Sequence, residues 1–136
     1  MPAIELDMLL AYLNKEDRLH RVASRIFASI YEGKLEHAYA TSSAYMEFEL
    51  VSKSMRVPTI QVARELHAFQ FFPNLQEHVL SLSIILKASS LRGVYAMTFF
   101  DSLHAATALA DDASIISVDK AYDDVGGLTR IEPSSL

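Results

Sequence analysis

Four acidic side chains occupy positions from which they could hold a metal ion together. Asp7 ends a short apolar stretch, Glu49 lies in a helical pattern, Asp101 opens an alanine-rich segment, and Asp119 follows a late apolar run. Carboxylates gathered in one cleft repel each other unless a hard divalent cation lies among them, and Mg²⁺ or Mn²⁺ prefers oxygen ligands. Such a cation can activate water and neutralise phosphate oxygens, so the set points to hydrolysis of a phosphodiester.

The segments that carry these acids alternate between strand and helix patterns. We expect strands over 4–7, 37–41, 77–79, 113–118 and 130–132, and helices over 8–13, 16–32, 42–55, 59–71, 80–91 and 101–110. This alternation is typical of an α/β fold with a parallel sheet and helices on both faces. Ligands bind outside the carboxyl ends of the strands in such sheets, so the four acids should converge there. The length fits a single domain, 1–136.

Composition excludes several other kinds of site. The chain has no cysteine, so it has no disulfide, thiolate nucleophile or cysteine-bound zinc. No His-x-x-x-His pair, Gly-rich phosphate loop or Gly-x-Ser-x-Gly turn is present. The net charge of -5 argues against binding nucleic acid through bulk positive charge, but it does not argue against a metal-dependent nuclease.

Four segments in order resemble the PIN domain, and more narrowly the VapC-like toxin ribonucleases. They are 4–7 (IELD), 43–50 (SAYMEFEL), 101–106 (DSLHAA) and 117–122 (SVDKAY). The resemblance implies an α/β/α sandwich and an endoribonuclease that depends on Mg²⁺ or Mn²⁺. It also implies an RNA substrate, a homodimer and a small antitoxin protein as partner. With no signal peptide and no membrane span expected from the sequence, we predict a cytoplasmic location.

By this resemblance Asp7, Glu49, Asp101 and Asp119 form the acidic tetrad, and Ser117 helps to position the site. Glu49 is preferred over Glu47 because Glu49 and the leucine after it match an acid-then-aliphatic pattern, although the helical wheel does not decide between the two. The family usually has a small polar residue two positions after the first acid, to support the metal site. This chain has Leu9 there.

Each acid also has a purely structural interpretation. Asp7 could end a strand, Asp101 could cap a helix, Glu49 could be a solvated helix residue, and Asp119 could form a turn. Because Leu9 departs from the family pattern, the main alternative function is a degenerate domain that binds protein or RNA without catalysis. A phospho-acceptor domain is a third alternative, but it needs adjacent acids after the first strand.

Other residues have uses that the pattern leaves open. His104 is interpreted as a packing or surface residue, and Asp123 could reach the edge of the site. Phe69 to Phe72 is dense enough in aromatic side chains to form part of a dimer or partner surface. Five basic residues could line an RNA path, namely Lys53, Arg56, Arg64, Lys87 and Arg92.

Overall fold

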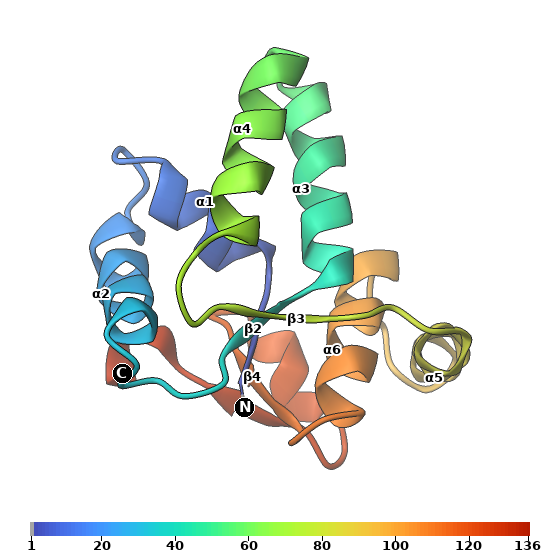
Figure 1. The fold of residues 1–136 in the computed structure, drawn as a ribbon. Helices are drawn as coiled ribbons and strands as arrows, with labels where there is room; N and C mark the ends of the chain where they lie inside the picture. The colour runs from blue at the N-terminus through green and yellow to red at the C-terminus, as the bar shows by residue number, and fades with distance from the viewer. Residues whose placement is uncertain (1) are drawn as a thin grey trace.

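The computed structural model describes residues 2–136, which form a parallel sheet between two layers of helices (Figure 1). The strands are β1 (Ala3–Ile4), β2 (Tyr39–Thr41), β3 (Gln76–His78), β4 (Ser114–Ile116) and β5 (Thr129–Ile131). Their order is β3-β2-β1-β4-β5, and every neighbouring pair is parallel. The predicted α/β/α sandwich is therefore confirmed. Because strand order reverses at β1, the crevice between β1 and β4 is where a ligand is expected.

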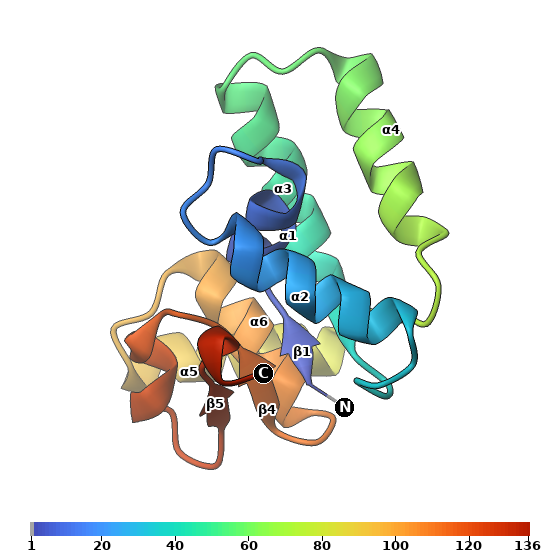
Figure 2. The same cartoon turned by 90° about the vertical axis from the view of Figure 1, so that its left-hand side faces the viewer.

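Six α-helices connect and cover the strands. They are α1 (Leu6–Leu13), α2 (His20–Tyr31), α3 (Ser42–Ser54), α4 (Thr59–Gln70), α5 (Leu82–Val94) and α6 (Phe99–Leu109). Two short 3-10 helices, Lys120–Asp124 and Pro133–Ser135, follow near the C-terminus. The helices α3 and α4 form a hairpin that projects beyond the sheet (Figures 1 and 2). Within residues 2–136, no helix is long and apolar enough to cross a membrane.

Alternate residues along the short strands supply two separate cores. Ala3, Tyr39 and Ile115 face α5, α6 and the first 3-10 helix, whereas Ile4 and Ile116 face α1 and α2. This period of two is what an extended strand imposes on side chains that are buried on both faces. A third cluster, Leu6 with Phe48 and Val62, joins α1 to the α3–α4 hairpin.

The first strand ends earlier than its sequence pattern predicts. It stops at Ile4, and α1 begins at Leu6 with Glu5 as its N-cap residue. The prediction that Asp7 ends a strand is therefore wrong, because Asp7 lies in the first turn of α1. Helix α2 also begins at His20 rather than near residue 16, since 15–19 form turns closed by Asn14 and Asp17. Thr41 caps α3 in place of the serines that follow it.

Phe27 is the central side chain of the aromatic contacts between α1, α2 and α4. It is fully buried, stacks on Tyr12 with ring centroids 4.3 Å apart, and contacts Phe72 edge-on at 5.3 Å. We predict that Phe27→Ala lowers the free energy of unfolding by about 3–5 kcal/mol, through lost burial and a cavity. Urea unfolding followed by circular dichroism measures this. Phe71→Ala is the matched control, because Phe71 is 68% exposed; an equal loss in both variants would contradict the assignment.

Candidate metal centre

Glu5 is a buried carboxylate at the carboxyl end of β1, beside β4. Its side chain is held from two sides: Ser117 donates to Oε1, and the Tyr122 hydroxyl donates to Oε2 at 2.7 Å. Burial first, and then the charges of Asp7 and Asp101, raise the pKa of Glu5 to about 8 despite the lowering effect of its two hydroxyl donors. The chain therefore places an acid where its negative charge is costly.

Asp101 reaches Glu5 from the first turn of α6. The hydroxyl of Thr98 caps this helix by accepting from the Asp101 backbone N–H at 3.2 Å. The helix dipole favours a carboxylate at this end. Tyr122 links the two acids, since its hydroxyl also lies 3.3 Å from Asp101 Oδ1. One side-chain ligand atom each from Glu5, Asp101 and His104 lies within 4.8 Å of the other two, close enough to share one cation.

Asp7 and Asp119 form the more open side of this group. Asp7 is partly buried, and its carboxylate accepts from the backbone N–H of Met8 at 2.7 Å and from that of Val118. Burial, together with the neighbouring charge of Asp119, raises the pKa of Asp7 to about 6 despite the lowering effect of its two backbone donors. Asp119 is exposed and caps the 3-10 helix by accepting from Ala121 N at 2.9 Å.

The two acids of α3 point in different directions. Residues two apart on an α-helix are separated by about 200° around its axis. Glu47 turns toward α6, where its Oε1 lies 3.0 Å from His104 Nε2. Glu49 is exposed and lines a hollow of about 270 Å³ between α3 and α4, together with Lys53 and Leu66. The structure thus brings Glu47, and not Glu49, into contact with His104, one turn after Asp101 on α6.

The described residues 2–136 place no lysine or arginine against this group of acids. Within residues 2–136, no lysine or arginine forms an ion pair with any of its members, which are Glu5, Asp7, Glu47, Asp101 and Asp119. A buried carboxylate without a cationic partner is either protonated or matched by a bound cation. The donor atoms are carboxylate oxygens with one buried imidazole close by, which fits a hard divalent cation such as Mg²⁺ or Mn²⁺.

Three residues near this site, Glu5, His104 and Tyr122, were not predicted as parts of it, and Glu47 was the alternative to the preferred Glu49. The position of Glu5 directly after the apolar pair Ala3 and Ile4 is the sequence feature that indicates a strand-end acid. The strand expected over 4–7 includes Glu5 and so hides this feature. His104 was expected as a packing or surface residue, and it is indeed fully buried. Its contact with Glu47 joins α6 to α3, and no local sequence pattern contains a contact across 57 residues.

Two other predicted neighbours have different partners. Ser117 lies beside Glu5, since it donates to that carboxylate and accepts from the Asp119 backbone N–H at 2.9 Å. Asp123 instead accepts from Arg130 Nε at 2.9 Å. The same arginine donates to the Ser117 carbonyl at 2.8 Å, so it stabilises the position of the residue whose hydroxyl donates to Glu5.

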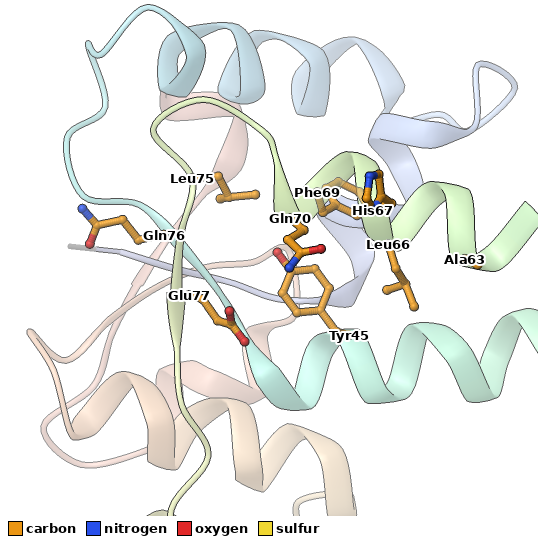
Figure 3. A pocket seen from close by; sticks show the side chains of 9 residues that line it. All are labelled: Tyr45, Ala63, Leu66, His67, Phe69, Gln70, Leu75, Gln76 and Glu77. Atoms are coloured by element: carbon orange, nitrogen blue, oxygen red, sulfur yellow. The ribbon is translucent and has the colours of Figure 1, made fainter.

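A separate hollow of about 400 Å³ lies between α3, α4 and β3 (Figure 3). The side chains of Tyr45, Gln70 and Glu77 come toward it from these three elements. None of the five grouped acids lines it. Burial, together with the charge of Glu77, raises the pKa of Tyr45, so its hydroxyl stays protonated.

Comparison with known proteins identifies the family. A model of the PIN domain matches residues 8–128, and the chain belongs to the PIN domain family. A search of curated proteins gives no match. VapBC2 from Rickettsia felis, bound to a DNA fragment from its promoter, aligns with a TM-score of 0.74 at 15% identity, over 95% of this chain and 96% of that one.

Two further solved structures share the fold. A toxin–antitoxin complex from Klebsiella pneumoniae aligns with a TM-score of 0.69 at 18% identity, over 98% of both chains. Mycobacterium tuberculosis VapC20, a toxin that cleaves the sarcin–ricin loop, aligns with a TM-score of 0.73 at 15% identity, over 93% of this chain and 95% of that one. At these identities the structures establish the shared architecture.

Stability should depend on pH through Glu5. The folded state raises the pKa of Glu5 from 4.5 to about 8, so it binds a proton more tightly than the unfolded chain does. The stability gained from that proton is fully present below about pH 4.5 and is lost as pH rises through 8. We predict that, in EDTA, the free energy of unfolding falls between these values, as measured by urea unfolding.

The variant Glu5→Gln should flatten this dependence above pH 6, leaving a slope at lower pH from Asp7. Glu49→Gln is the matched control, since Glu49 is exposed, and it should keep the parent slope. An unchanged slope in Glu5→Gln would show that Glu5 does not carry the proton.

Proposed function

We propose that this protein is an endoribonuclease that depends on Mg²⁺ or Mn²⁺. The observation that carries the proposal is the cluster of unneutralised acids at the carboxyl edge of the sheet, with Glu5 buried at its centre. Membership of the PIN domain family, a family of nucleases, supports hydrolysis of nucleic acid. RNA is the substrate we expect, because VapC20, which has the same fold, cleaves the sarcin–ricin loop.

Glu5, Asp7, Asp101 and Glu47 would hold the cation in this proposal. Glu47 replaces Glu49 of the expected tetrad because it alone turns toward α6. Glu5 replaces Asp7 as the first acid, and Asp7 then stands two positions after it, where the family has a small polar residue. Leu9 is fully buried in the core and takes no part, so it no longer counts against a working site. Asp119 would act at the exposed rim.

The bound cation would supply activation of a water molecule and neutralisation of phosphate charge. The chain's own residues prepare this site. Ser117 and Tyr122 fix the Glu5 carboxylate through hydroxyl donors, and Arg130 holds the Ser117 backbone in place. The Tyr122 hydroxyl stays protonated because burial and the charge of Glu5 raise its pKa, so it remains a donor.

The toxin of a toxin–antitoxin pair is the biological role we propose. The support is that solved structures with this fold include a toxin–antitoxin complex. A hollow of about 420 Å³ between α2 and α4 exposes the aromatic rings of Tyr31 and Phe71, at 60% and 68%. Apolar side chains exposed together favour a protein partner, and we propose that a small antitoxin covers them. The homodimer and the cytoplasmic location stay predictions.

Cleavage assays with paired variants test the catalytic proposal. We predict that the parent cuts total RNA containing ribosomal RNA with Mg²⁺ or Mn²⁺ and not in EDTA. Glu5→Gln and Asp101→Asn should each lower the rate by about 10² or more, because each removes one charge from the metal site. The most informative comparison is between the two acids of α3. Glu47→Gln should lower the cleavage rate at least about tenfold, whereas Glu49→Gln should leave it unchanged.

Each result has a distinct meaning. Cutting that survives in EDTA, or in Asp101→Asn, would contradict metal-dependent catalysis at this site. A lower cleavage rate in Glu49→Gln, with full activity in Glu47→Gln, would show that Glu49 is the acid that α3 contributes to the site. Saturable Mn²⁺ binding without cutting of any RNA would favour the degenerate binding domain.

A further inference from the structure

His104 is a buried side chain whose two ring nitrogens both have partners on α3 or its cap. It is fully buried on α6, one turn after Asp101. Nδ1 lies 2.7 Å from Ser43 Oγ and 3.2 Å from Thr41 Oγ1, and Nε2 lies 3.0 Å from Glu47 Oε1. The ring of Phe100 stacks beside it, with centroids 6.3 Å apart. Both nitrogens of a buried imidazole need hydrogen-bond partners, and here all of these partners lie on α3 or its N-cap, so the ring fixes how α6 meets α3.

The partners of the ring define where its proton lies. An ionised carboxylate only accepts hydrogen bonds, so Nε2 must carry the proton that points at Glu47. In the neutral ring Nδ1 is then an acceptor, and its donor is the hydroxyl of Ser43 at 2.7 Å or that of Thr41 at 3.2 Å, two groups that are hydrogen-bonded to each other at 3.1 Å. Thr41, the N-cap of α3, already accepts from Ala44 N at 3.1 Å and holds this end of the helix in place.

We propose that His104 is a positioning residue for the metal site: the hydroxyl pair of Ser43 and Thr41 sets its tautomer, and its Nε2–H holds the Glu47 carboxylate on the α6 side of α3. The proposal rests on the function proposed above. A glutamate has three rotatable bonds, and Glu47 is only partly buried, so without this bond its carboxylate would populate several rotamers. The bond occupies Oε1 and leaves Oε2 available to a cation.

His104 as a metal ligand is the competing interpretation. Its ligand atom lies within 4.8 Å of those of Glu5 and Asp101. Both nitrogens, however, already have partners in hydrogen-bond contact, and a ligating nitrogen would have to give one up. The two interpretations differ in how the effects of His104 and Glu47 combine, because a positioning residue acts only through the residue that it positions.

A double-mutant cycle on Mn²⁺ binding tests the proposal. Free Mn²⁺ is measured by electron paramagnetic resonance for the parent, His104→Asn, Glu47→Gln and the double variant, with melting curves to check folding. His104→Asn keeps a polar side chain but is too short to reach Glu47, and we expect it to weaken Mn²⁺ binding about tenfold. The double variant should bind no more weakly than Glu47→Gln alone. His104→Gln, which can place an N–H near the Nε2 position, should restore most of the affinity.

Ser43→Ala gives a second route that leaves His104 in place, in case its replacement unfolds the chain. It should weaken Mn²⁺ binding in the same direction, whereas Ser42→Ala, whose hydroxyl donates to the His78 carbonyl, should not. Losses that add in the double variant, or no loss in His104→Asn, would overturn the positioning role. RNA cleavage measured on the same samples separates the proposals: Mn²⁺ binding with the predicted cycle but no cutting would refute the nuclease and leave the role of His104 intact.

Discussion

The burial of the Glu5 carboxylate among other acids is the constraint on which the site depends. Glu5 is 6% exposed, faces the charges of Asp7 and Asp101, and has no basic partner within the described residues 2–136. A chain that folds with this group must protonate it, surround it with donors or admit a cation. The structure supplies donors from Ser117 and Tyr122, and it raises the pKa of Glu5 to about 8. A buried carboxyl group whose pKa is strongly raised among other acids is typical of a functional site, here one that binds a metal ion.

The helices deliver the other acids to this point from independent parts of the fold. Helix α6 brings Asp101 with its first turn, and it also carries His104, which reaches Glu47 on α3. One helix thus supplies Asp101 itself and the side chain that contacts Glu47. Arg130 on β5 also stabilises this site, because it donates a hydrogen bond to the backbone carbonyl of Ser117. Movement of α6 relative to the sheet would therefore disturb both Asp101 and the contact that holds Glu47.

Much of the fold could be predicted from the sequence, because apolar alternation and helical spacing are local signals. All five strands and six helices were expected near their true positions. The candidate site was harder, because which acid points inward depends on a helix beginning at Leu6 rather than Met8, and on a rotation of 200° between Glu47 and Glu49. Asp101, Asp119 and Ser117 are set by element ends that local patterns mark well. Tyr122 and His104 contact residues that are far away in the sequence, so no local sequence pattern predicts these contacts.

The most direct test of the account is to locate the cation. Crystals grown with Mn²⁺ and measured near the manganese absorption edge would show its position by anomalous scattering. The account predicts a peak bonded to carboxylate oxygens of both Glu5 and Asp101, at about 2.1–2.2 Å. A peak held by Glu49 or by Asp119 alone, with Glu5 still bound only to Ser117 and Tyr122, would contradict it.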